Sequence, residues 1–170
     1  MTDLGKMRYF LGVEVTQNDK GIFITQQKYA REILTRFGME QCNMVCNPIV
    51  PGNKLSRDES RKSVDSTNFK QMVGCLMYLL ATRPDLTYVV CLIARYMEKP
   101  TELHFAAAKR ILRYLKDSLQ YGILYKKGEL NCELEGWSDS NCAGDLDDRK
   151  STSGYVYKMG SRAISWSSKK

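Results

Sequence analysis

Residues 136–170 read GWSDSNCAGDLDDRKSTSGYVYKMGSRAISWSSKK, and this stretch decides the fold expected for the C-terminal part of the chain. Leu134, Gly136 and Trp137 lead into Asp139 with the alternation typical of a β-strand. A carboxylate at a strand end is a typical first ligand of a two-metal nuclease site, which needs several carboxylates. Asp139 is therefore a candidate catalytic and metal-binding residue that we expect to be insufficient alone.

The hydrophobic pattern has a period of two beyond residue 120, which predicts short antiparallel strands. The expected strands span residues 123–125, 130–136, 153–159 and 163–166, with glycines in the turns between them. Aspartates at positions 145, 147 and 148 fall in one of these turns, and two basic residues follow at once. We interpret them as a solvated acidic turn rather than a metal site.

Further upstream, residues 9–15 and 21–25 are β-rich and are joined by a polar stretch with the composition of a hairpin turn. Thr25 is the expected N-cap of a helix that ends at Gly38, because apolar residues recur behind it at helical spacing. Between residues 40 and 67 the periodicity is lost, which predicts a linker or a long surface loop.

Three helices are predicted between residues 68 and 116, each with one apolar face, and we expect them to form a small bundle. Arg83 and Pro84 break the first helix, and Asp85 is positioned to cap the second or to pair with Arg83. Thr101 is the expected cap of the third. His104, near the start of that helix, has no nucleophile pattern beside it and is interpreted as a structural capping residue.

The formal net charge is +7, which favours a polyanionic partner such as nucleic acid. Candidate phosphate contacts on the third helix are Lys109, Arg110, Arg113 and Lys116. A solvated helix face explains the same four residues equally well.

Six cysteines show no tight paired spacing, so we expect free thiols in a reducing compartment rather than disulfides or a zinc site. The N-terminal residues contain no uninterrupted apolar signal region, and no window has the length of a membrane-spanning helix. We therefore expect an intracellular protein, in the cytoplasm or nucleus, with no membrane partner.

Five motifs occur in order along the chain. They are YFLGVEV with GIFITQQKYA, then VGCLMYLLATRPDLTYVV, HFAAAKRILRYLKD, WSDSNCAGDLDDRKSTSGYV and ISWSSKK. In this order and spacing the chain resembles, over essentially its whole length, the Pol polyprotein of Ty1/copia-type LTR retrotransposons. The resemblance implies the C-terminal part of a reverse transcriptase followed by the start of its RNase H domain.

The fold implied by this resemblance is α+β, with a β-hairpin and a helical thumb-like region followed by an incomplete, mainly antiparallel RNase H-like sheet. Residues 1–52 would be the end of the polymerase palm, and residues 53–67 a linker or long loop. Residues 68–120 would form the helical thumb or connection, and residues 121–170 the first strands of RNase H.

In the family, such a region grips the template and primer, an RNA:DNA hybrid, and leads into the nuclease. Asp139 matches the first carboxylate that binds Mg²⁺ in the complete enzyme. No Y-x-D-D motif occurs in the chain, and in the family the catalytic Glu lies beyond the segment matched by Lys170. We therefore expect neither polymerase nor nuclease activity from these residues alone, no cofactor, and other Pol segments as partners.

Two alternatives belong to other classes of protein. One is a nucleic-acid-binding module recruited from a retroelement. The other is a secreted effector of the RxLR type, because residues 110–113 read RILR. That motif lies mid-chain, inside a predicted helix and without a signal peptide, which disfavours the effector.

Overall fold

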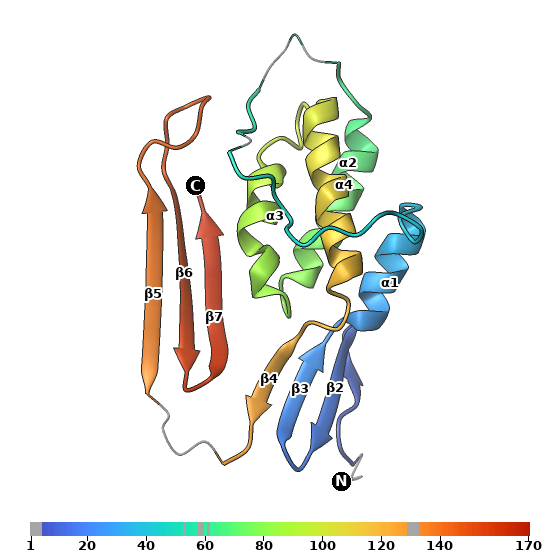
Figure 1. Ribbon diagram of the computed structural model, residues 1–170, viewed down its shortest axis with the longest axis vertical. Helices are drawn as coiled ribbons and strands as arrows, with labels where there is room; N and C mark the ends of the chain where they lie inside the picture. Colours follow the sequence, from blue (N-terminus) through green and yellow to red (C-terminus); the bar gives the residue numbers. More distant parts are fainter. Residues whose placement is uncertain (1–4, 53, 58–59, 61, 129–132) are drawn as a thin grey trace.

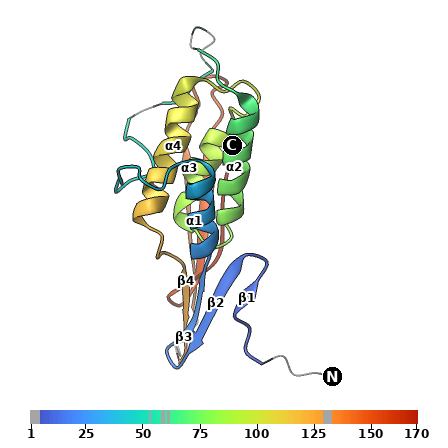
Figure 2. The same ribbon diagram turned by 90° about the vertical axis from the view of Figure 1, so that its right-hand side faces the viewer.

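The computed structural model describes residues 5–52, 54–57, 60, 62–128 and 133–170. Over these residues the fold is α+β, with two antiparallel sheets and four α-helices. Figure 1 and Figure 2 show the helices gathered at one end of the molecule and the sheet β1–β4 at the other. The second sheet, β5–β7, lies beside helix α3 (Figure 1).

The N-terminal sheet has the strand order β1 (Tyr9–Phe10), β2 (Val13–Asn18), β3 (Gly21–Thr25) and β4 (Ile123–Lys126). The predicted hairpin is confirmed by the β2–β3 pairing, and the Asn18 side chain accepts a hydrogen bond from the backbone N–H of Lys20 (2.9 Å) in its turn. The β-rich run at residues 9–15 is not one strand, because the backbone turns at Leu11 and Gly12 (φ 45° and 76°) and β1 pairs antiparallel with β2. The strand predicted at residues 123–125 pairs with β3, not with β5. Gly21 permits this pairing, because a Cβ there would lie 2.1 Å from the Tyr125 carbonyl oxygen.

Helix α1 (Gln27–Arg36) begins one residue later than predicted. Thr25 is not its N-cap, because the Thr25 hydroxyl donates to the Tyr121 carbonyl (3.2 Å), just before β4. The Thr25 side chain therefore bonds to a residue far away in the sequence instead of capping the helix that follows it. The side chain of the N-cap residue itself, Gln26, makes no capping hydrogen bond.

The predicted helical bundle is confirmed, and α1 joins it. Its other members are α2 (Ser66–Leu79), α3 (Thr87–Ala94) and α4 (Glu102–Asp117), with a 3₁₀ turn at Pro84–Leu86 between α2 and α3. The largest fully buried side chains include Phe69, Met72, Leu76, Ile93 and Leu112. Burying apolar side chains of this size stabilises a domain by roughly 1.5–3 kcal/mol each. None of the described helices has the length and apolar character needed to cross a bilayer.

Asp85 does not cap α3, where the N-cap is Leu86. Its carboxylate instead accepts two hydrogen bonds from the Arg83 guanidinium (2.7 and 2.9 Å), so the predicted Arg83–Asp85 pair is confirmed. Arg83 is almost fully buried and also donates to the Ser118 carbonyl and hydroxyl. This pair joins the break after α2 to the end of α4.

His104 acts as the predicted capping residue of α4. Its Nδ1 accepts from the backbone N–H of Thr101 (3.0 Å), its Nε2 lies 3.1 Å from the Ser56 carbonyl oxygen, and its ring stacks on Tyr96. His104→Ala is expected to lower the free energy of unfolding by about 2 kcal/mol, because it removes a buried ring and leaves buried polar groups without partners.

Urea denaturation followed by circular dichroism measures this effect. Glu102→Gln, which neutralises an exposed acid in the same first turn, is the control and should change stability by less than about 1 kcal/mol. Equal effects of the two substitutions would contradict the capping role.

The C-terminal sheet consists of β5 (Leu134–Asn141), β6 (Thr152–Met159) and β7 (Arg162–Lys169), in that order. Of the strand predicted at residues 130–136, positions 130–132 lie outside the described residues. Trp137, Val156 and Trp166 are register partners, so they share one face of the sheet. The Trp166 indole N–H donates to the Leu80 carbonyl at the end of α2 (2.9 Å), which shows that this face packs on the helices.

Candidate functional site

Asp139 lies on β5, on the face of the sheet that is turned toward the helices. Its register partner on β6 is Gly154, and Gly154 pairs in turn with Ser168 on β7. The Asp139 carboxylate is exposed and accepts a hydrogen bond from the backbone N–H of Ser140 (2.8 Å). No acidic residue shares its row across the sheet, so a second carboxylate ligand does not come from its register neighbours.

A cleft of about 590 Å³ separates this face from the start of α3. Its walls include Asp139, Trp137, Trp166, Thr87 and Tyr88. Among the described residues that line it, Asp139 is the only carboxylate and none is Lys or Arg. A phosphate group that enters this cleft therefore meets a negative charge, and its approach requires a cation that neutralises the carboxylate.

Carboxylate oxygens are the protein ligands that Mg²⁺ prefers, so the chemistry of Asp139 fits that ion. In the described residues, however, no group of three or more His, Cys, Asp or Glu side chains is placed to hold a metal. The site therefore offers a single ligand, and a single carboxylate binds Mg²⁺ weakly because the ion keeps most of its water molecules.

The turn between β5 and β6 is the predicted solvated acidic turn at Asp147 and Asp148, which are exposed, but the prediction is wrong for Asp145. Asp145 is 6% exposed, and its carboxylate contacts Lys170 Nζ (2.6 Å) and Arg95 Nη1 (3.3 Å). It also accepts from the backbone N–H groups of Asp147 and Asp148. A buried carboxylate with these partners is a structural anchor, and we name Asp145, Arg95 and Lys170 the acid anchor.

The acid anchor connects the C-terminal sheet to the helices. Arg95 follows α3, and its second terminal nitrogen donates to the Thr152 hydroxyl on β6 (2.6 Å). Asp147 accepts two hydrogen bonds from the backbone N–H of Arg57, so the segment before α2 is held as well. Burial alone would raise the pKa of Asp145, but the Lys170 ammonium group and the two backbone N–H groups outweigh it and lower the pKa to about 2.

The four basic residues predicted to contact phosphates all lie on α4, but three of them bind another part of the chain. Lys116 donates to the Cys42 carbonyl (2.8 Å), Arg113 to the Asn43 carbonyl (2.6 Å), and Arg110 to the Asn47 side chain. These contacts hold residues 42–50, which we name the strap, along the helix. Lys109 is exposed and lies over the Phe105 ring at 4.8 Å.

The rings of Tyr114 and Tyr121 both lie close to the Arg83 guanidinium. The Arg83 guanidinium carbon is 5.8 Å from the Tyr114 ring centre and 5.4 Å from that of Tyr121. The Tyr114 hydroxyl also donates to Asp85 (3.0 Å), and burial together with the Asp85 carboxylate raises the pKa of Tyr114. Tyr114 therefore contacts both members of the Arg83–Asp85 pair, whereas Tyr121, whose side chain is half exposed, contacts Arg83 alone.

The cysteines described by the structure are free thiols, as predicted. They are Cys42, Cys46, Cys75, Cys91 and Cys142, whereas Cys132 lies outside the described residues. Burial raises the pKa of the Cys91 thiol, because the thiolate loses its hydration there.

Comparison with known proteins identifies relatives over almost the entire chain. It is 42% identical over 168 residues to a retrovirus-related Pol polyprotein from transposon RE1 of Arabidopsis thaliana, which covers 99% of this chain and 11% of the relative. An uncharacterized mitochondrial protein of the same plant is 37% identical over 171 residues, covering 100% of this chain and 70% of the relative. A secreted RxLR effector protein of Plasmopara viticola is 41% identical over 99 residues, covering 58% of this chain and 69% of the relative.

No protein-family model matches the chain, and no solved structure is significantly similar to it. The chain spans about a tenth of the length of the transposon Pol polyproteins that it matches, at 33–42% identity. That similarity extends over the hairpin, the helices and the second sheet alike, since it covers nearly every residue. The chain therefore belongs to the family of Pol polyproteins encoded by Ty1/copia-type retrotransposons.

Proposed function

We propose that these residues are the part of a retrotransposon Pol polyprotein in which reverse transcriptase ends and RNase H begins. In this proposal, residues 1–52 belong to the palm, and residues 53–67 link them to a thumb-like or connecting helical unit at residues 68–120. Residues 121–170 lead into RNase H through the sheet β5–β7. Within the parent protein the segment grips the RNA:DNA hybrid and passes it toward the nuclease.

The observation that carries this proposal is the placement of Asp139. Asp139 lies on strand β5 of an antiparallel sheet, beside a cleft whose described lining residues include no Lys or Arg. Its carboxylate suits the first Mg²⁺ ligand of a two-metal nuclease. Cleavage by that route requires further carboxylates to hold both ions. We propose that other segments of Pol supply them, and that these 170 residues do not cleave nucleic acid alone.

The test is a Mg²⁺-dependent cleavage assay on an RNA:DNA hybrid duplex. The purified chain and its Asp139→Asn variant should both show only background cleavage, while a complete Pol polyprotein of the family serves as the positive control. Mg²⁺-dependent turnover that disappears in Asp139→Asn would show that the chain completes the site itself, and the proposed inactivity would then be wrong.

The strap changes how α4 can contact a phosphate backbone. Lys109 is exposed, whereas Arg113 and Lys116 each donate one hydrogen bond to a carbonyl oxygen of the strap. A charged phosphate oxygen is a stronger acceptor for these cations than a neutral carbonyl oxygen. We therefore propose that Lys109 makes the first contact, and that Arg113 and Lys116 exchange the strap carbonyl oxygens for phosphate oxygens as the hybrid binds.

Lys109→Gln is expected to weaken hybrid binding and to reduce the dependence of log K on log [salt] by about one unit of slope, because one phosphate contact is lost. Fluorescence anisotropy at several salt concentrations measures both quantities. Lys70→Gln removes the same charge from an exposed position on α2 and is the matched control. Identical slopes of log K against log [salt] for the two variants would show that Lys109 on α4 makes no specific contact with the hybrid.

A second candidate function is a nucleic-acid-binding module used outside a retroelement, favoured by the net charge of +7. Salt-sensitive binding in cells that produce this chain without the rest of Pol would support it. The effector alternative is less favoured, because RILR lies inside α4, where Ile111 is 1% and Leu112 is 0% exposed. The two apolar residues of the motif belong to the hydrophobic core.

A further inference from the structure

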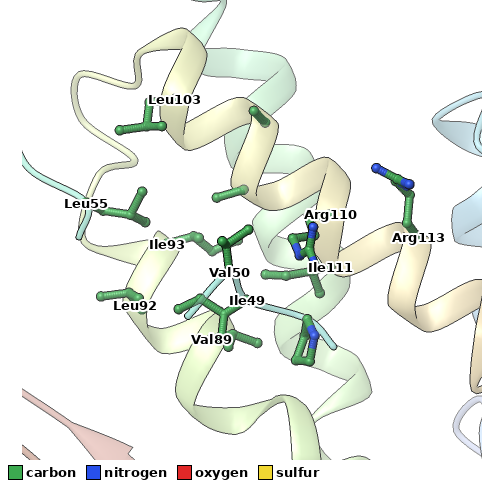
Figure 3. Close-up of a pocket in the computed structure, with 13 residues that line it drawn as sticks. Ile49, Val50, Leu55, Val89, Leu92, Ile93, Leu103, Arg110, Ile111 and Arg113 are labelled. Atoms are coloured by element: carbon green, nitrogen blue, oxygen red, sulfur yellow. The ribbon is translucent and has the colours of Figure 1, made fainter. Parts of the chain in front are cut away.

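The charge of the cleft beside Asp139 differs from that of three other pockets in the described residues, each of which has Lys or Arg in its lining. Figure 3 shows one of these, between α3, α4 and residues 48–55, with Arg110 and Arg113 in a mainly aliphatic lining. The lining of the cleft beside Asp139 contains a carboxylate and no such cation. Its charge therefore favours a cationic occupant.

The Asp139 carboxylate is free to receive a cation. It is exposed, it accepts a hydrogen bond from the backbone N–H of Ser140, and it forms no ion pair with the described residues. A cation that enters the cleft therefore does not have to displace an existing partner of this carboxylate.

The Trp137 indole provides an aromatic face next to this carboxylate. Lys158 Nζ lies over the indole, 5.0 Å from the ring centre. Lys158 is the register partner of Glu135, so it reaches the ring from the side away from Asp139. The opposite face of the ring is therefore turned toward Asp139, and the Trp137 side chain is 52% exposed, which leaves that face accessible.

The space next to Trp137 and Asp139 is not filled by the neighbouring strand, because Gly154, the register partner of Asp139, has no side chain. Tyr88 on α3, which is 45% exposed, lines the cleft from the helical side. A cation in this space therefore meets a carboxylate and aromatic rings from both walls. The face of an aromatic ring attracts cations through its quadrupole.

We propose that this cleft binds the guanidinium group of an arginine side chain carried by another polypeptide. A guanidinium is weakly hydrated, stacks on aromatic faces and hydrogen-bonds to carboxylates, so one group contacts Trp137 and Asp139 together. A lysine ammonium group is more strongly hydrated, and Mg²⁺ keeps most of its water molecules and gains little from a ring. The cleft volume of about 590 Å³ also leaves room for the aliphatic stem of the arginine.

The proposed function assigns the same carboxylate to Mg²⁺, so the two ligands would compete for Asp139. The guanidinium site does not depend on that assignment, because it uses the indole ring as well and needs no further carboxylate.

NMR titration of the purified chain with N-acetyl-arginine amide and N-acetyl-citrulline amide, followed at the backbone N–H signals of β5, tests the proposal. Citrulline has nearly the shape of arginine but no charge. The arginine probe is expected to bind saturably and about fivefold more tightly, as one cation–π contact and one exposed ion pair together allow. N-acetyl-lysine amide and methylguanidine should both bind more weakly than the arginine probe, because the first is more strongly hydrated and the second lacks the apolar stem.

Asp139→Asn should abolish the preference for arginine over citrulline. Glu135→Gln removes the same charge from the same strand and face, on the other side of Trp137, and should retain the preference. Trp137→Leu should reduce the preference about threefold, since the cation–π contact is lost. Circular dichroism spectra show whether each variant is folded, and if Trp137→Leu fails to fold, the exposed substitution Asp139→Asn still decides.

Equal affinities for arginine and citrulline, or an unchanged preference in Asp139→Asn, would overturn the proposal. Lysine or methylguanidine binding as tightly as the arginine probe would overturn the assignment to an arginine side chain. The cleavage assay on the RNA:DNA hybrid does not depend on any of these results, so failure of this site is distinguishable from failure of the proposed function.

Discussion

Asp85→Ala should lower the free energy of unfolding by about 3 kcal/mol, the cost typical of removing one partner from a buried ion pair. The reason lies in Arg83, whose side chain is 4% exposed and whose guanidinium would lose its carboxylate. The Ser118 carbonyl and hydroxyl oxygens would remain as acceptors, but neither carries a compensating charge. Urea denaturation at neutral pH, followed by tryptophan fluorescence and circular dichroism, measures the change.

Two further variants separate the buried pair from a general effect of removing an acid. Asp117→Ala removes an exposed carboxylate at the end of α4 and should leave stability within about 0.5 kcal/mol. The double variant Arg83→Met/Asp85→Ala removes both charges and should be more stable than Asp85→Ala alone, because no buried charge is left unpaired. A double variant no more stable than the single one would mean that the unpaired guanidinium is not the source of the loss.

Asp145→Asn is expected to cost about 2 kcal/mol at pH 7, because Lys170 and Arg95 lose the carboxylate that joins them in the acid anchor. The same loss should occur in the unaltered chain as acid protonates Asp145. Its pKa is about 2 in the folded chain and 3.8 as the ordinary value, so the folded-state value is depressed. The contribution is therefore fully present above about pH 4 and is lost as the pH falls toward 2.

Denaturation curves at pH 7, 4 and 3 for both proteins measure this difference. The difference in free energy of unfolding between Asp145→Asn and the unaltered chain should become smaller as the pH falls. Glu135→Gln removes an exposed acid on the same sheet, 3.8 Å from Lys158, and should leave the pH dependence unchanged. A gap that stays constant from pH 7 to pH 3 would show that the Asp145 charge does not stabilise the fold.

Trp166 fluorescence reports locally on loss of the acid anchor, because the Trp166 indole N–H donates a hydrogen bond from the sheet to the Leu80 carbonyl at the end of α2. In a Trp137→Phe background Trp166 is the single tryptophan of the chain. Its emission should shift to longer wavelength in Asp145→Asn if loss of the anchor lets the sheet separate from the helices.

Much of the fold follows from local patterns in the sequence. The hairpin, the helical bundle and the cap of α4 depend on residues close together in the chain, such as Asn18 in its turn and His104 three residues after Thr101. The Arg83–Asp85 pair is local in the same sense. Such features are decided by periodicity and side-chain reach, and a single sequence contains both.

Two of the predictions that were wrong involve partners far away in the sequence. Thr25 has the side chain of an N-cap, but its hydroxyl bonds to a carbonyl 96 positions later. Asp145 lies in a segment with the composition of a surface turn, yet its carboxylate is buried against Arg95 and Lys170. No local sequence pattern connects these two residues to Asp145. The strap was missed for the same reason, since Asn43 lies 70 positions from Arg113. The roles of Asp139 and of the basic residues on α4 stay predictions until the experiments above are done.

The pairing of β3 with β4 has a consequence for how the chain folds. The two strands are separated by all four helices, and closing so large a loop costs conformational entropy before the strand pair repays it. The helices rely on local contacts and form faster than such distant strand pairs. During synthesis the outer edge of β3 therefore remains unpaired until β4, which follows α4, has been made, and in that interval the nascent chain presents an open strand edge to any neighbouring polypeptide.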